Sequence, residues 1–268
     1  MPKTETKDLV QAESKNLTLD LSAFAEFQNK DGVALGLENV EVTDIKMPRH
    51  KLLQSNSVEV STGKGKPGQF YNTLTGECSD ELEVSLLCMG RSRVRFEKPY
   101  KRGAQPVCRS FDAKHSQDGE LCKNCEFADW DKAKEAGENA PPCRESLTWT
   151  FLENGAVGEL PSRIIVSGAS RAGHANFITM LTGTGYPPFI FKTKISSAQT
   201  QNDSGIFYVM NFEIMTDENK APATYSLDQA RQLEAECKKW KNMQDRFADF
   251  DTANAVDDVI EDNEGAIF

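Results

Sequence analysis

Apolar and polar residues alternate along much of the chain, which predicts a mainly β protein. In residues 91–96 the alternation is complete: three arginines would share one face of a strand, and Val94 and Phe96 the other. The last two predicted strands would form a hairpin, because Asn202-Asp203-Ser204-Gly205 between them is a typical turn sequence. The full set of predicted strands is 70–74, 81–89, 91–96, 147–152, 163–168, 189–196 and 206–215.

Two segments have helical spacing. Ser170 would cap a helix over residues 171–182, which Gly183 and Gly185 would end. The motif Ser226-x-x-Gln229 is typical of a capping box and would open a second helix. Its apolar stripe would pack against the core or against a second copy of the chain, so a homo-oligomer is one prediction. The stripe consists of Leu233, Cys237, Trp240, Met243, Phe247 and Phe250.

The order of the elements predicts an OB-fold-like barrel over residues 41–218, with a Cys-rich insertion at 104–145 and one interior helix. A β-sandwich is the competing architecture. Around this domain we expect a mobile acidic arm at 1–40, an amphipathic helix at 219–250 and a disordered acidic tail at 251–268.

The charge distribution changes the picture that the net charge of −10 suggests. Residues 1–45 carry four lysines and nine acids, and residues 249–268 carry seven acids with no Lys or Arg. Residues 46–102, in contrast, carry eleven basic residues against six acids. A basic centre in an acidic chain predicts a site for a polyanion.

The basic centre and the aromatic residues near it are typical of a groove that binds single strands, in which bases stack on aromatic rings. We predict that Lys64 and Lys66, in a Gly-rich loop, would hold phosphates. The other predicted basic contacts are Arg91, Arg93, Arg95, Lys98, Lys101, Arg102, Arg109, Lys192 and Lys194. The predicted stacking residues are Phe70, Tyr71, Tyr100, Phe111 and Trp149.

Four of the seven cysteines lie in or beside the insertion, at positions 108, 122, 125 and 143. Their C-x13-C-x2-C-x17-C spacing predicts a structural Zn²⁺ site with Cys108, Cys122, Cys125 and Cys143 as ligands. His115 could replace Cys108. A redox dithiol, disulfides, inert thiols and an iron–sulfur cluster are the alternatives.

The C-terminus, DDVIEDNEGAIF, resembles the tail of bacterial and phage single-stranded DNA-binding proteins, which end in an acidic run and a terminal Phe. The resemblance implies that the tail docks replication and recombination proteins and competes with DNA for the basic groove. Ile267 and Phe268 would be the apolar anchors. The steering charge would come from Asp257, Asp258, Glu261, Asp262 and Glu264.

Two further features resemble phage proteins. The Cys-rich insertion is similar to that of zinc-bearing single-stranded DNA-binding proteins of some tailed phages, although the ligand spacing differs. The segment PGQFYNTLTGE, the C-x2-C pair and Pro-Pro-Cys143 resemble a group of phage-encoded proteins.

Enzymatic motifs are weak. Residues 63–68 lack the P-loop pattern, and residues 168–173 miss the G-x-S-x-G elbow by one position. No apolar run approaches membrane-spanning length, and the first residues lack an apolar signal region, so we expect a cytoplasmic protein. The hypothesis is a non-enzymatic protein that binds single-stranded DNA in phage replication, recombination and repair. The alternatives are a zinc-stabilised adaptor that does not bind nucleic acid, and a metal-dependent nuclease or recombination enzyme.

Overall fold

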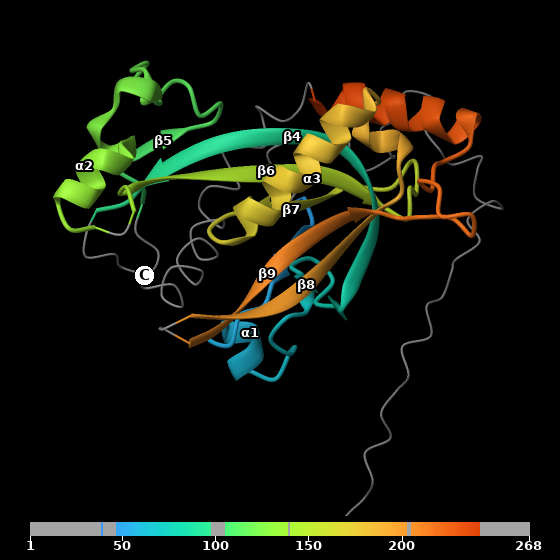
Figure 1. The fold of residues 1–268 in the computed structure, drawn as a ribbon, viewed down its shortest axis with the longest axis horizontal. Helices are drawn as coiled ribbons and strands as arrows, with labels where there is room; N and C mark the ends of the chain where they lie inside the picture. The colour runs from blue at the N-terminus through green and yellow to red at the C-terminus, as the bar shows by residue number, and fades with distance from the viewer. Residues whose placement is uncertain (1–38, 40–46, 98–104, 139, 203–204, 242–268) are drawn as a thin grey trace, which may run out of the picture. The chain divides into compact units, whose positions relative to one another are not determined.

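The computed structural model describes residues 39, 47–97, 105–138, 140–202 and 205–241 (Figure 1). The chain divides into two compact units, Met1–Glu41 and Val42–Phe268, and apart from Asn39 the described residues belong to the second. The predicted tail at 251–268 and the rest of the arm at 1–40 lie outside the described residues.

Nine strands form one sheet in the order β3-β2-β1-β7-β6-β4-β8-β9, and β5 pairs with β4 off this path. The β1–β7 pair is parallel and the other pairs are antiparallel. The strands are β1 (Arg49–Leu52), β2 (Phe70–Asn72), β3 (Cys78–Ser79), β4 (Glu81–Arg95), β5 (Cys108–Ser110), β6 (Cys143–Glu153), β7 (Ser162–Val166), β8 (Thr193–Asn202) and β9 (Gly205–Ile214).

The helical elements are short except for two. They are α1 (Val58–Ser61), α2 (Trp130–Glu135), α3 (Ser170–Thr184) and the 3-10 turns η3 (Cys122–Asn124), η4 (Glu126–Ala128) and η5 (Pro188–Ile190). Residues 227–241 are also helical. In the part of the chain that the structure describes, no helix is long and apolar enough to cross a membrane.

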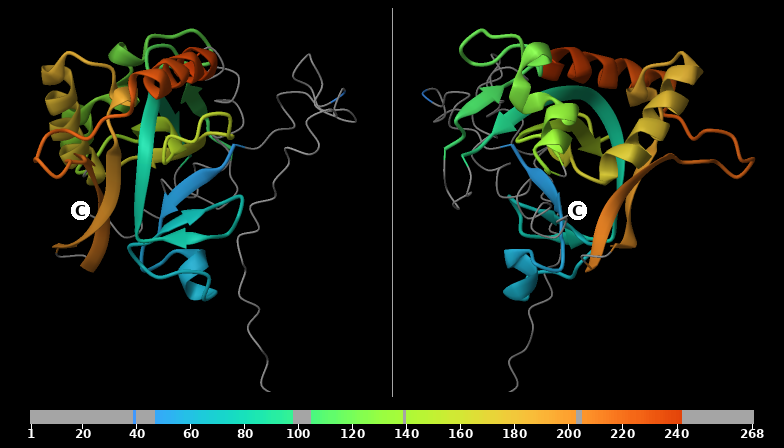
Figure 2. Two further views of the ribbon diagram at one scale, coloured as in Figure 1. Left: turned by 90° about the vertical axis from the view of Figure 1, so that its right-hand side faces the viewer. Right: turned by 60° about the vertical axis from the view of Figure 1, so that its left-hand side comes forward.

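The long strand β4 organises the sheet because it pairs with β6 along most of its length, from Val84 opposite Glu153 to Arg95 opposite Cys143. β4 is one continuous strand where the sequence predicted two, at 81–89 and 91–96. One end of β4 also pairs with β8, and the other end with β5. β4 bends strongly, so that the sheet curls into a half-barrel (Figure 2).

The main core lies between one face of this sheet and α3. Phe177 and Leu181 of α3 pack with sheet residues that include Phe151 and Phe212. A second cluster lies on the opposite face of β6, where Leu233 and Trp240 of the C-terminal helix pack with Leu87 and Leu152. Neighbouring residues of β6 thus serve two cores, which follows from the two-residue period of a strand.

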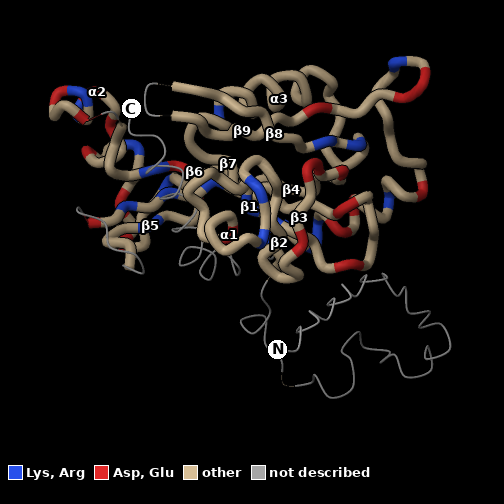
Figure 3. Tube along the Cα trace, turned by 90° about the horizontal axis from the view of Figure 1, so that it is seen from below, with Lys and Arg blue, Asp and Glu red and all other residues tan. Residues whose placement is uncertain are grey.

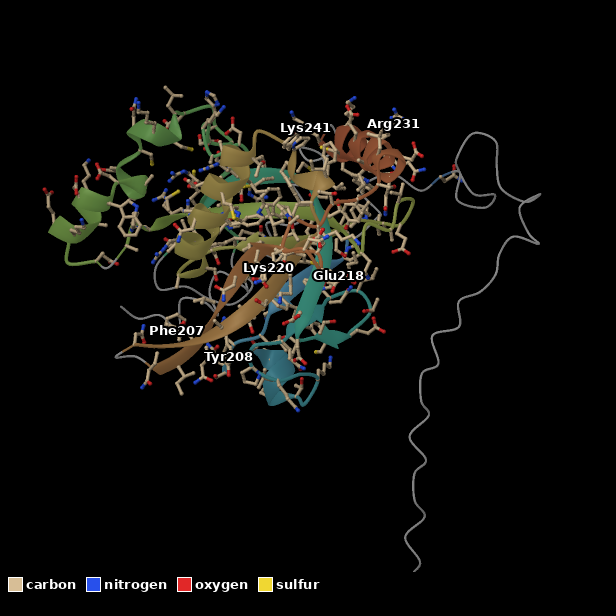
Figure 4. The ribbon with its side chains drawn as sticks, turned by 45° about the vertical axis from the view of Figure 1, so that its right-hand side comes forward. Phe207, Tyr208, Glu218, Lys220, Arg231 and Lys241 are labelled. Atoms are coloured by element: carbon tan, nitrogen blue, oxygen red, sulfur yellow. The ribbon has the colours of Figure 1, made fainter. Side chains whose placement is uncertain are left out.

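Side chains cover the outer edge of β9. The side-chain amide of Gln54 bonds to the backbone of Tyr208, and the hydroxyl of Ser170 accepts a hydrogen bond from the backbone N–H of Met210, at 2.9 Å. Phe207 and Tyr208 lie in the half of β9 nearer the hairpin tip (Figure 4). These bonds protect an edge that would otherwise present open backbone groups.

The structure confirms the mainly β class, the β8–β9 hairpin and a helix that begins after Ser226. It also corrects several boundaries. Ala169, not Ser170, is the N-cap of α3, and the Ser170 hydroxyl accepts from the Met210 N–H instead. The helix runs past Gly183 and ends at Gly185, the second of the two predicted glycines, which is left-handed. Residues 188–190, where the predicted strand at 189–196 would begin, form η5 instead.

Candidate nucleic-acid interface

The arginines of β4 lie on the face of the sheet that carries the main core. A register shift between Leu86 and Cys88 changes which positions face the core. Val84 and Leu86 before the shift, and Met89 after it, pair with odd-numbered residues of β6. Arg91, Arg93 and Arg95 continue the same side of the strand past the end of the core. We call these three residues with Arg171 the arginine face.

Glu145 of β6 holds three members of the arginine face together. Its carboxylate lies 2.9 Å from Arg91 Nη1, 2.5 Å from Arg93 Nη2 and 3.0 Å from Arg171 Nη2. Arg171 comes from the first turn of α3 and also donates to the backbone carbonyl of Glu145 at 3.2 Å. Three guanidiniums against one carboxylate leave a surplus of two positive charges.

Glu145 holds these arginines in place, and their side chains are still accessible to solvent. The side chains of Arg91 and Arg171 are 53% and 38% exposed, whereas Glu145 is 13% exposed. Other Lys and Arg residues also lie at this end of the sheet, beside β5 and β6 (Figure 3). Because the arginine fork matches phosphate geometry, a fixed set with surplus charge is suited to bind a phosphate backbone.

Two aromatic side chains that the sequence did not single out lie in the insertion, and one of them contacts the arginine face. The guanidinium carbon of Arg95 lies 3.7 Å from the ring centroid of Phe127 in η4, which is a cation–π contact. Trp130, at the start of α2, is 57% exposed. The sequence did contain a signal for these two residues: they are aromatic residues in the otherwise polar segment EFADW, directly after the C-x2-C pair. No predicted core strand or helix explains aromatic residues at that place.

Two predicted stacking residues belong to the core instead. Phe70 is fully buried, and Trp149 is 2% exposed and donates its indole N–H to His174 Nε2 at 2.7 Å. Neither ring can stack on a base in this fold. Tyr71 and Phe111 are half-buried and stay candidates.

The predicted contacts Lys194 in β8 and Lys192 just before it do not extend the arginine face. β8 pairs with residues 81–84 of β4, which are about 25 Å of chain away from the arginines. Lys194 is also neutralised there, since its Nζ lies 2.7 Å from Glu213 and 3.8 Å from Glu81. Lys192 is exposed, and its Nζ lies 5.6 Å from the ring centroid of Tyr225.

The other predicted basic residues are also separated from the arginine face. Lys64 and Lys66 are exposed in a loop that packs against the β8–β9 hairpin, where Ser197 donates to the Gly68 carbonyl at 2.6 Å. Arg109 pairs with Val94 in the register and therefore lies on the opposite side of the sheet. The predicted contacts Lys98, Tyr100, Lys101 and Arg102 lie outside the described residues.

The four cysteines of the predicted zinc site lie around the same end of the sheet. Cys108 and Cys143 flank Arg95 in the register, one on each neighbouring strand. Cys122 begins η3 and Cys125 ends it. In the described residues no three His, Cys, Asp or Glu side chains are arranged to hold a metal ion, and all seven cysteines are free thiols. The alternative ligand His115 instead contacts Asp112, with Nδ1 3.1 Å from the carboxylate.

A curled β sheet with a preorganised arginine face defines this chain as a mainly β protein with a candidate polyanion surface. The chain belongs to the phage-derived family described as Pam3 phage gp34-like protein, whose model matches residues 12–241. Neither the curated proteins nor the solved structures include a match to it.

Proposed function

We propose that this phage-family protein binds single-stranded DNA through the arginine face during replication, recombination and repair. The observation that carries the proposal is the cluster of three arginines around Glu145 with its surplus of positive charge. Phosphates would bind the guanidiniums, and bases would stack on Phe127 and Trp130. The proposal includes that the sheet exposes this face of β4 to the DNA in the way that an OB-fold does.

The proposal implies weak sequence dependence and strong salt dependence. Phosphate contacts carry no base information, and each neutralised phosphate releases counterions. The stacking residues favour single strands, because bases in a duplex do not expose their faces.

We propose in addition that the acidic tail recruits replication or recombination proteins and competes with DNA for the arginine face. Deleting residues 251–268 would then tighten DNA binding at low salt and have less effect at high salt, where charges are screened. Unchanged or weaker binding after the deletion would contradict this competition.

The direct test is a fluorescence-anisotropy titration of a labelled dT oligonucleotide at several salt concentrations, with duplex DNA as competitor. We expect Arg91→Gln with Arg93→Gln to weaken binding and to flatten the salt dependence. The matched control is Lys192→Gln with Lys194→Gln, which removes the same charge at the start of β8, beside the other end of β4. Thermal unfolding of each variant shows that it is folded.

Wild-type protein that fails to bind at low salt, both with and without its tail, would contradict DNA binding and favour the protein adaptor. Degradation of the oligonucleotide when a divalent ion is added would favour a nuclease. Equal losses in the arginine and lysine variants would remove the arginine face from the proposal.

A further inference from the structure

The Cys-rich insertion is ordered with little hydrophobic core of its own. In residues 105–138 and 140–142 the buried apolar side chains are Cys122, Ala133, Ala140 and Pro141. Larger apolar side chains of the same segment are exposed: Val107, Leu121, Phe127 and Trp130. Hydrophobic burial is therefore too small to account for the fold of the insertion.

Local hydrogen bonds order individual turns of it. The carboxylate of Asp112 accepts bonds from the backbone N–H groups of Lys114 and His115, at 2.7 and 2.8 Å. Asp129 caps α2 in the same way. Such turns fix neighbouring residues, and the insertion is joined to the sheet through β5, which pairs with β4, and through the start of β6.

The cysteines lie at the points where the insertion meets the sheet. Cys108 stands in β5 and Cys143 at the start of β6, on either side of Arg95. The C-x2-C pair lies over the same place, because η4 follows it directly and brings Phe127 onto Arg95.

We propose that Cys108, Cys122, Cys125 and Cys143 together bind one zinc ion that fastens the insertion to the end of the sheet. Binding would draw the C-x2-C pair toward the two strand cysteines, and each thiol that becomes a ligand would lose its proton to solvent. Four thiolates and Zn²⁺ carry a net charge of −2. Arg95, which lies between Cys108 and Cys143 in the register, and Arg93 on the same side of β4 would offset it. The proposal is independent of DNA binding.

A disulfide fits the strand cysteines less well. Cys108 and Cys143 lie two strands apart, which places their Cα atoms about 9.5 Å from each other. That separation exceeds the span of a disulfide.

The test is the metal content of the full-length protein, expressed with added zinc and measured by elemental analysis. We expect about one zinc per chain, and a loss of most of it in Cys122→Ser and Cys125→Ser. Cys78→Ser, which removes a half-buried thiol outside the cluster, should keep the wild-type content. A second assay titrates Co²⁺ into chelator-treated protein, because thiolate-bound cobalt absorbs visible light.

A variant that unfolds is replaced by Cys125→His, which supplies another zinc ligand and should retain the metal. Zinc far below one per chain, iron in its place, or serine variants with wild-type zinc would each overturn the proposal. Because the DNA titration is a separate experiment, a metal-free protein that binds DNA would contradict only the zinc site.

Discussion

The side-chain amide of Gln54 forms with Tyr208 both of the hydrogen bonds that a neighbouring strand would form. Gln54 Nε2 donates to the Tyr208 carbonyl and Gln54 Oε1 accepts from the Tyr208 N–H, each at 2.9 Å. Gln54 is 8% exposed and lies two residues beyond β1. One side chain therefore links β9, the last strand of the sheet order, to the segment that follows β1.

We expect Gln54→Leu to destabilise the protein by about 2 kcal/mol, because it leaves two backbone groups of Tyr208 without partners in a largely buried place. The melting temperature should fall by about 5 °C. Calorimetry checks this, with the exposed Gln201→Leu as the control expected to change little. Equal shifts in the two variants would show that the link contributes nothing.

Glu145→Gln tests the charge of the arginine face. The substitution removes the one carboxylate among Arg91, Arg93 and Arg171 and keeps a hydrogen-bond acceptor. We expect DNA binding at low salt to tighten by about fivefold, or about 1 kcal/mol, because phosphates no longer compete with the carboxylate. Glu213→Gln, at Lys194, is the matched control. Weaker binding by Glu145→Gln would mean that the carboxylate is needed to position the arginines.

Phe127→Ala and Trp130→Ala test base stacking. Each should weaken binding of a dT oligonucleotide by about 1–3 kcal/mol, since a stacking ring contributes that much per base. Tyr186→Ala removes an aromatic ring that is 64% exposed at a site beyond the end of α3, and should leave the affinity unchanged. If all three variants bound equally well, stacking would have to involve other residues.

The buried environment of His174 predicts that the stability of the protein depends on pH. Its pKa is lowered to about 4 by burial, with Arg171 and Arg91 adding to the effect, and its Nε2 accepts the Trp149 bond as a neutral imidazole. The unfolded chain takes up this proton near pH 6.5, well before the folded protein does. Stability from this residue is therefore complete above pH 6.5 and is lost as the pH falls toward 4, by up to about 3 kcal/mol.

Urea unfolding between pH 7 and pH 4 measures this loss. His174→Gln keeps an acceptor for Trp149 but cannot titrate, so its stability should depend less steeply on pH than that of the wild type. An unchanged dependence in His174→Gln would assign the effect to other groups.

The sequence by itself determined the local elements, because the period of apolar residues is a local property. It predicted the mainly β class, the hairpin that joins Asn202 to Gly205, and a helix after Ser226. Half of the capping box is formed there: the Ser226 hydroxyl accepts from the Gln229 N–H, while the Gln229 side chain turns to the Gly155 carbonyl.

The tertiary structure decided which side of each element is buried and which distant residues meet. The register shift beside Leu86 puts the β4 arginines on the core side, and an uninterrupted alternation would put them on the other. Long-range packing buries Trp149 against His174 and brings Arg171 to Glu145. Phe127 reaches Arg95 only because the insertion folds back over the sheet. These contacts join residues far apart in sequence, and local periodicity carries no information about such pairs.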